Sequence, residues 1–193
     1  GKTSEYEIEF RGVSFKYADA AADSLEDVSI KIKKGETIGI IGSTGCGKST
    51  LVNLIPRLYD CTQGEVLVDG VNVKDYDEES LRDKIGIVMQ KSVMFGGSIR
   101  DNIRMGKLDA TDEEISEAVQ AAQAQNVVDG KKQGLDYIVE QGGKNLSGGQ
   151  MQRLCIARAL VKKPGILILD DSSSALDYAT DAALRKSLSS LSY

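Results

Sequence analysis

The chain has 193 residues, 41% hydrophobic and 27% charged, with a formal net charge of −5, which suits one globular domain with or without a subdomain. This acidic balance gives no support for nucleic-acid binding, and the complete absence of histidine excludes histidine-based catalysis and most zinc chemistry. We expect neither a membrane span nor a signal peptide, and the three widely spaced cysteines (Cys46, Cys61 and Cys155) indicate a reducing compartment without a disulfide framework.

The N-terminal part of the chain is predicted to form β-structure. Residues 6–17 alternate apolar and polar side chains in two short bursts. After a predicted loop at 19–24, residues 28–32 alternate as a half-exposed antiparallel strand does. Residues 36–41 form a short apolar, β-branched run, which predicts a buried strand.

A glycine-rich loop follows this last predicted strand. Residues 42–49, Gly-Ser-Thr-Gly-Cys-Gly-Lys-Ser, fit the pattern G-x-x-x-x-G-K-[ST] of loops that hold a nucleotide by its phosphates. Residues 49–55 predict the first two turns of a helix, so the strand, loop and helix that the pattern requires are all present. Glycines permit the dihedral angles that point consecutive N–H groups at phosphate oxygens, and the helix would turn its positive dipole end toward the anion.

The side chains of this loop indicate a nucleoside triphosphate. Lys48 would reach the β- and γ-phosphates, and the hydroxyl of Ser49 would ligate Mg²⁺. The spacing of the glycines excludes the dinucleotide pattern G-x-G-x-x-G, and the absence of an Asn-Lys-x-Asp motif disfavours GTPase function.

Downstream of the loop, the pattern predicts an α/β core that is interrupted by helices. Pro56 is expected to kink or end the helix, residues 64–70 predict a strand closed by an Asp-Gly turn, and residues 85–89 predict a further strand. A helical insertion is expected at roughly 92–160, where residues 111–114 (Thr-Asp-Glu-Glu) form a capping box. The helix after this box has an apolar face made of Ile115, Ala118, Val119 and Ala122.

Two carboxylates follow a strand near the C-terminus. Residues 166–169 (Ile-Leu-Ile-Leu) predict a fully buried strand that ends at Asp170 and Asp171, and residues 178–191 predict a helix. In a phosphate-loop nucleotidase, an acidic residue at such a strand end holds Mg²⁺ from the side opposite the loop hydroxyl. Asp170 is the candidate for this role.

Residues 146–150, Leu-Ser-Gly-Gly-Gln, precede a further predicted helix. Ser147 is expected to cap the helix while Gln150 reaches back to it, and the two glycines of the first turn leave N–H groups open to an anion. Taken alone, this pattern predicts only a capped helix.

Together and in this order, the phosphate loop, Leu-Ser-Gly-Gly-Gln, Ile-Leu-Ile-Leu-Asp-Asp and residues 174–177 (Ser-Ala-Leu-Asp) closely resemble the ATP-binding-cassette (ABC) nucleotide-binding domain. Residues 51–60 and 94–103 are most similar to exporters of the multidrug and peptide type. The resemblance covers nearly the whole chain. It implies a single domain over residues 1–193, expected to be truncated at its C-terminus, with the α/β fold of P-loop NTPases. This fold has a RecA-like core, an antiparallel β subdomain and the inserted α-helical subdomain at about 92–160.

The resemblance also implies a role for individual residues. Tyr17 would stack on adenine, Gln90 would sense Mg²⁺ and the attacking water, and Lys48 and Asp171 would take part in hydrolysis. Mg²⁺ would be held by Ser49, Gln90 and Asp170. The residues expected to contact ATP are Tyr17, Gly42, Ser43, Thr44, Gly45, Cys46, Gly47, Lys48, Ser49 and Thr50.

A second cassette is a further implication, because neither ATP site of such dimers is complete in one chain. Asp177 matches a loop that touches the facing subunit. The signature residues that would cap the partner's γ-phosphate are Ser147, Gly148, Gly149 and Gln150. The expected partners are this second cassette, identical or different, and transmembrane domains, which would place the chain at the cytoplasmic side of the cell membrane.

The chain departs from the family pattern at Asp171, where the usual catalytic residue is glutamate. The aspartate side chain is one methylene shorter than that of glutamate. General-base catalysis raises a reaction rate by ~10²–10⁴-fold, and a misplacement of the base by about 1 Å can lower the rate by ~10²-fold. We therefore expect a poorly hydrolysing site, as in the degenerate half of a heterodimeric exporter whose intact signature completes a competent site on its partner.

Two alternatives to this motor domain stay open. In the first alternative, the chain is a dimerisation module that ATP controls and that does no chemistry itself. Asp171 favours this role for the ATP site of this chain. The other alternative is a soluble ABC ATPase of DNA repair or translation, which the absence of a long coiled-coil pattern, of a second cassette and of basic tracts disfavours.

Overall fold

The computed structural model describes residues 4–91, 93–171 and 174–193. The chain divides into two compact units, an N-terminal unit (Gly1–Arg82) and a C-terminal unit (Asp83–Tyr193). The expected helical insertion at 92–160 falls within the C-terminal unit, and its standing as a subdomain of its own stays a prediction.

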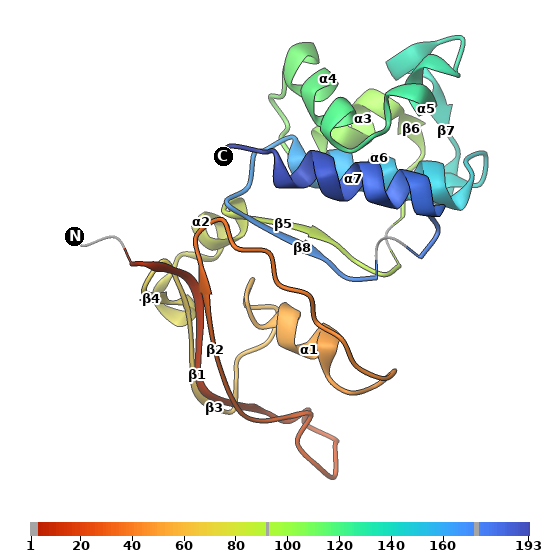
Figure 1. The fold of residues 1–193 in the computed structure, drawn as a ribbon. Helices are drawn as coiled ribbons and strands as arrows, with labels where there is room; N and C mark the ends of the chain where they lie inside the picture. Colours follow the sequence, from red (N-terminus) through yellow and green to blue (C-terminus); the bar gives the residue numbers. More distant parts are fainter. Residues whose placement is uncertain (1–3, 92, 172–173) are drawn as a thin grey trace. The chain divides into compact units, whose positions relative to one another are not determined.

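The N-terminal unit is built on a four-stranded antiparallel sheet in the order β2-β1-β3-β4 (Figure 1). Its strands are β1 (Tyr6–Phe15), β2 (Leu25–Lys33), β3 (Gln63–Val68) and β4 (Val71–Asn72). The predicted strands at 6–17, 28–32 and 64–70 are therefore confirmed. The described part of this unit also contains the short helical segments α1 (Lys48–Asn53) and η1 (Val73–Asp75), and α2 (Glu78–Asp83) ends at the first residue of the C-terminal unit.

Consecutive residues are buried on β1 and β3, whereas β2 alternates half-buried and exposed side chains from Val28 to Lys33. On β1, Phe10 and Val13 are buried, and Val66 and Val68 of β3 are buried as well. The strands β3 and β4 are joined by Asp69 and Gly70, whose φ angles of 49° and 78° are both positive, as a type I′ turn requires. The Asp-Gly turn predicted from sequence is thus confirmed, and α1 ends before Pro56, as expected.

The predicted buried strand at 36–41 is wrong. The segment has no strand assignment, and Ile38, Ile40 and Ile41 are 44%, 43% and 97% exposed. A strand exists only where a neighbour pairs its N–H and C=O groups. Among the described residues of the N-terminal unit, the sheet consists of β1 to β4 alone, so the apolar run has no neighbouring strand there.

The C-terminal unit contains two parallel strands, β5 (Ile85–Val88) and β8 (Ile166–Leu169), which pair from Ile85 opposite Ile166 to Val88 opposite Leu169. Both strands were predicted. The expectation that β8 is fully buried is wrong, because Ile166 and Ile168 are buried while Leu169 is 38% exposed. Strand β8 pairs only with β5 among the described residues of this unit, so alternate side chains leave one face partly open.

In the described part of the C-terminal unit, five α-helices (Figure 1) contribute buried side chains to one apolar core. They are α3 (Ile99–Arg104), α4 (Asp112–Ala121), α5 (Gln125–Asp129), α6 (Gly148–Leu160) and α7 (Tyr178–Ser189). Two 3₁₀ turns, η2 (Gly134–Asp136) and η3 (Gln141–Gly143), and a short antiparallel pair of β6 (Gly97–Ser98) with β7 (Ile138–Val139) complete the unit. The pattern of the sequence did not predict β6 or β7.

Helices α3, α4 and α6 each supply large, fully buried side chains to this core. The predicted apolar face of α4 is confirmed, since Ile115, Ala118, Val119 and Ala122 are all buried. The capping boxes at Thr111 and Ser147 are both present, as predicted. On α6, Leu154 and Ile156 are completely buried.

Truncation of this core should cost stability. Leu154 is 0% exposed, so we expect Leu154→Ala to lower the free energy of unfolding by about 2–5 kcal/mol through lost burial and the cavity it leaves. Leu108 is 85% exposed, and Leu108→Ala is the matched control, expected to stay within about 0.5 kcal/mol of the parent chain. Urea unfolding followed by circular dichroism measures both. Equal effects of the two substitutions would contradict the assignment of Leu154 to the core.

Acidification should weaken the start of α4. Hydrogen bonds from the Lys107 ammonium and then from the backbone N–H of Thr111 lower the pKa of the Glu114 carboxyl. Because the folded pKa lies below the unfolded value of about 4.3, this contribution is complete above that value and is lost as the pH falls through the folded pKa. We expect Glu114→Gln to reduce stability near neutral pH and to flatten its decline below about pH 5, in urea unfolding over a pH series. If the dependence of stability on pH were the same in Glu114→Gln and in the parent chain, the Glu114 charge would not contribute to stability.

Candidate functional site

The phosphate loop, residues 42–49, lies on the surface of the N-terminal unit and leads into α1. Gly45 and Gly47 have φ angles of 80° and 96°, in the left-handed region that side chains of L-residues rarely adopt. A Cβ on Gly47 would also lie 2.7 Å from the carbonyl oxygen of Ser24. Glycine at position 47 is therefore required both by the backbone angle and by the close approach of the loop that precedes β2.

Lys48 folds over the loop that precedes it. Its Nζ donates hydrogen bonds to the backbone carbonyls of Gly42 and Ser43, the second at 3.0 Å, and lies 3.7 Å from Sγ of Cys46. Cys46 is exposed. The ammonium group thus lies at the loop itself, next to three of the residues expected to contact ATP.

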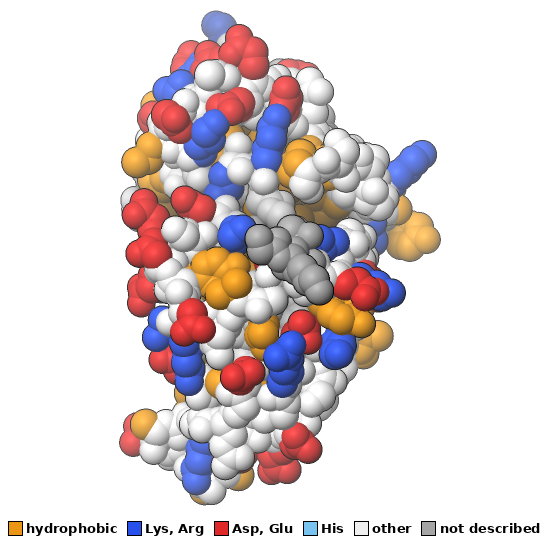
Figure 2. Space-filling view, turned by 90° about the vertical axis from the view of Figure 1, so that its left-hand side faces the viewer, with side chains coloured by type: hydrophobic (Ala, Val, Ile, Leu, Met, Phe, Trp, Pro, Cys, Tyr) orange, Lys and Arg blue, Asp and Glu red, His pale blue; other side chains and the backbone are white. Residues whose placement is uncertain are grey.

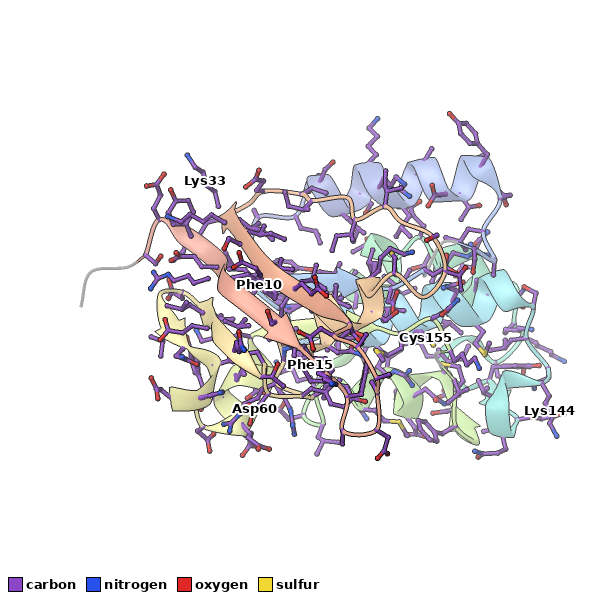
Figure 3. All side chains as sticks on the ribbon, turned by 90° about the horizontal axis from the view of Figure 1, so that it is seen from below. Phe10, Phe15, Lys33, Asp60, Lys144 and Cys155 are labelled. Atoms are coloured by element: carbon purple, nitrogen blue, oxygen red, sulfur yellow. The ribbon has the colours of Figure 1, made fainter. Side chains whose placement is uncertain are left out.

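Tyr17 contacts the first turn of α1, although the two are 33 residues apart in sequence. Its hydroxyl lies 2.9 Å from Oγ1 of Thr50. Its ring packs edge-on against Phe15, at a centroid distance of 4.7 Å, and against Tyr59, at 5.5 Å. Figure 3 labels Phe15 near the end of β1, the strand that leads to Tyr17. The structure therefore brings together two residues that the sequence assigned to nucleotide contact.

In the C-terminal unit, the parallel pairing of β5 and β8 brings their carboxyl ends to one edge. Gln90 follows β5 and Asp171 follows β8, and Nε2 of Gln90 donates a hydrogen bond of 3.1 Å to Oδ2 of Asp171. The backbone N–H of Asp170 donates to the carbonyl of Val88 at 2.9 Å, which extends the ladder by one residue. Asp171 has a φ of 50°, an uncommon angle for a side-chain-bearing residue. Gln90 and Asp171 thus form one hydrogen-bonded pair.

The signature residues form the N-terminus of α6. Oγ of Ser147 accepts from the backbone N–H of Gln150, and Oε1 of Gln150 accepts from the backbone N–H of Ser147, each at 3.1 Å. A Cβ on Gly149 would lie 3.0 Å from the carbonyl oxygen of Ala175, and one on Gly148 would lie 3.4 Å from the Ala175 side chain. The small glycines therefore let the segment before α7 approach this helix end.

Asp177 is the N-cap of α7. Its carboxylate accepts hydrogen bonds from the backbone N–H of Thr180 at 2.8 Å and from the Thr180 hydroxyl at 3.0 Å, and these bonds lower the pKa of Asp177. The spacing of Asp and Thr was a signal for this cap that the sequence analysis did not use. The residue expected to face a partner therefore also begins a helix of 12 residues.

Sequence reasoning missed Arg153, which ties α6 to the connection between α4 and α5. Its guanidinium donates to the carbonyl of Gly149 at 3.2 Å, to the carbonyl of Gln123 at 2.9 Å and to Oδ1 of Asn126 at 2.8 Å. The contact with Gly149 is one helical turn away and could have been expected, whereas contacts 27 and 30 residues away carry no local signal. Arg153 thus holds the first turn of the signature helix against its neighbours.

The chemistry of the candidate metal ligands fits Mg²⁺. Ser49 in the N-terminal unit offers a hydroxyl, and Asp170 and Gln90 in the C-terminal unit offer a carboxylate and an amide oxygen. Hard oxygen donors of this kind suit Mg²⁺ better than softer metals.

On the face drawn in Figure 2, acidic and basic side chains are interspersed instead of forming a basic patch. Among the described residues, no helix has the length and apolar character that crossing a bilayer requires.

Comparison with known proteins identifies relatives of this chain. It is 46% identical over 185 residues to a putative multidrug export ATP-binding/permease protein of Staphylococcus aureus and 45% identical over 184 residues to the protein YgaD, of the same description, in Bacillus subtilis. The alignments cover 96% and 95% of this chain but 32% of each relative, so the chain spans about a third of their length.

A solved structure has the same fold. The structure of a bacterial Atm1-family ABC exporter with ATP bound superimposes with a TM-score of 0.90 and 35% identity, over 97% of this chain and 33% of that one. The P-loop NTPase fold predicted from sequence, a mixed α/β domain with an antiparallel sheet, is confirmed by this match. The family model for the ABC transporter matches residues 25–174. On this combined sequence and structural evidence, the chain belongs to the ABC transporter family and is similar to the nucleotide-binding part of multidrug-type exporters.

Proposed function

We propose that this chain binds ATP with Mg²⁺ and couples its hydrolysis to export, as the nucleotide-binding domain of a multidrug-type exporter. The observation that carries the proposal is the phosphate loop, with glycine at its two left-handed positions and the ammonium of Lys48 folded over it. The names of the relatives, which combine ATP binding with a multidrug export permease, support the coupling to transport.

The residues divide the work as follows. The backbone N–H groups of residues 42–49 and the ammonium of Lys48 would bind phosphate oxygens. The ring of Tyr17 would stack on the base. Ser49, Asp170 and Gln90 would hold Mg²⁺, which neutralises charge on the β- and γ-phosphates when bound.

A second cassette would complete each site. The capped N-terminus of α6 presents Ser147 and the two glycines on the 13-residue signature helix, where unpaired N–H groups favour an anion. We propose that this surface closes over the γ-phosphate bound by the partner, with Asp177 facing that partner. Transmembrane domains would anchor the pair at the cytoplasmic side of the membrane.

Asp171 supports a slow site within this chain. Its stem is one methylene shorter than that of glutamate, and its carboxylate is hydrogen-bonded to Gln90 at 3.1 Å. A general base must lie within hydrogen-bond reach of the attacking water, so a short and already bonded carboxylate is poorly suited to that task. The same observation supports the second candidate, a module whose dimerisation ATP controls without hydrolysis at its own site.

Removal of the loop ammonium should weaken nucleotide binding. We expect Lys48→Ala to weaken Mg·ATP binding by about 10- to 100-fold, because a charge-assisted hydrogen bond to phosphate is lost. Isothermal titration calorimetry measures the affinity. Lys31→Ala is the control in the same unit, since that ammonium lies 5.0 Å from the Tyr6 ring instead of at the loop. Undiminished affinity of Lys48→Ala would overturn the phosphate site.

Substitutions at position 171 distinguish a domain that hydrolyses ATP at its own site from a dimerisation module that does not. In the assembled transporter, we expect Asp171→Glu to raise turnover at this chain's own site by up to about 10²-fold, since the longer stem restores the reach of a general base. We expect Asp171→Asn to leave total turnover nearly unchanged. Loss of most turnover in Asp171→Asn would show that Asp171 already serves as the base. Single-turnover hydrolysis at saturating ATP is the measurement.

A further inference from the structure

The surface beside the phosphate loop carries three aromatic side chains in mutual contact. Phe15 is 5% exposed, whereas Tyr17 and Tyr59 are 37% and 43% exposed. The ring centroids of Tyr17 and Tyr59 lie 5.5 Å apart with an interplanar angle of 83°, and those of Phe15 and Tyr59 lie 5.5 Å apart at 53°. We call Phe15, Tyr17 and Tyr59 the aromatic cluster.

We propose that Tyr59 and the hydroxyl of Tyr17 are positioning residues for the base of the bound nucleotide, because they fix the orientation of the Tyr17 ring relative to the phosphate loop. This inference rests on the nucleotide site proposed above. It assigns a role to Tyr59, a residue outside the phosphate loop, which the sequence analysis used only as part of the exporter-like stretch at 51–60.

The packing of the cluster restricts the Tyr17 ring while leaving it available for stacking. Phe15 and Tyr59 both meet Tyr17 at close to right angles, 88° and 83°, so neither takes the parallel position that a base would occupy. Edge-on aromatic pairs are favourable beyond the area they bury, so these two contacts favour one orientation of the Tyr17 ring. The ring keeps 37% of its residue surface exposed for a ligand.

The hydroxyl of Tyr17 supplies the second constraint. Its bond of 2.9 Å to Oγ1 of Thr50 connects the ring to the helix that carries the phosphate loop at its start. The hydroxyl therefore points toward α1 instead of toward the edge of a base. As a result, the distance and angle between the stacking surface and the phosphate-binding groups are set by protein contacts.

Tyr59 is itself held in place by the turn around it. Arg57 on one side forms an ion pair of 2.8 Å with Asp60 on the other, and the guanidinium also donates to the carbonyl of Lys74 at 3.4 Å. The hydrogen bond from Arg57 lowers the pKa of the Asp60 carboxyl, so the pair is intact at neutral pH. The turn at 57–60 thus presents Tyr59 to Tyr17 at a fixed position.

Binding of two ligands by the full chain tests this assignment. Calorimetric affinities are measured for Mg·ATP and for Mg·tripolyphosphate, which has the phosphates but no base. We expect Tyr59→Leu to weaken ATP binding by about 2- to 10-fold and to leave tripolyphosphate binding unchanged. Tyr59→Phe keeps the ring and is expected to bind both ligands like the parent chain. Tyr17→Phe loses only the hydroxyl and is expected to lose ATP affinity by about 2- to 10-fold, again selectively.

Each other outcome overturns the inference in a distinct way. Unchanged ATP affinity in Tyr59→Leu and Tyr17→Phe would show that the cluster does not position the base. Equal weakening of both ligands would show a general effect on the loop instead of an effect on the base. If the parent chain bound neither ligand, the proposed nucleotide site itself would fail. Tyr76→Phe is a control in the same unit, because the Tyr76 hydroxyl donates to Val68 at a distance of 3.0 Å, within the β-sheet region.

Discussion

The proposed nucleotide site depends on one backbone constraint, the left-handed conformation of Gly47. A side chain at this position would be strained by the φ angle of 96° and would collide with the carbonyl of Ser24, 2.7 Å from an added Cβ. The position directly precedes Lys48, so the backbone angle at Gly47 also fixes where α1 begins. Because Gly47 has no side chain, the loop before β2 can pack closely against the phosphate loop at the point where α1 begins.

In the C-terminal unit, strand pairing takes the place of this loop constraint. The in-register pairing of β5 with β8 carries Gln90 and Asp171 to the same edge from positions 81 residues apart. Buried contacts of α6 with α3 and α4 in turn hold the capped end of the signature helix. Side chains that belong to distant motifs thus owe their places to ordinary packing of apolar strands and helices.

Local patterns were predictable because their physical cause is local. The turn at Asp69 and Gly70, the capping boxes at Thr111 and Ser147, and the buried face of α4 each need only residues within a few positions of one another. The order of the motifs then predicted the family and its fold.

Features that depend on distant partners were not predictable in the same way. The apolar run at 36–41 has the composition of a strand, but composition does not supply a neighbour to pair with. The contact of Tyr17 with Thr50 and the contacts of Arg153 join segments 27 to 33 residues apart, which no periodicity encodes. The role of Tyr59 likewise appears only once the rings are seen together.

The cap at Asp177 has a mechanical consequence. The carboxylate of Asp177 caps the start of α7. It also belongs to the segment that, by resemblance to the family, is expected to face a neighbouring subunit. Any group that drew this carboxylate away from Thr180 would leave backbone N–H groups of the first turn unsatisfied and would loosen that end of α7. Engagement of a neighbour and the cap of α7 would then compete for the same two carboxylate oxygen atoms, so contact at a subunit boundary would loosen the first turn of this helix.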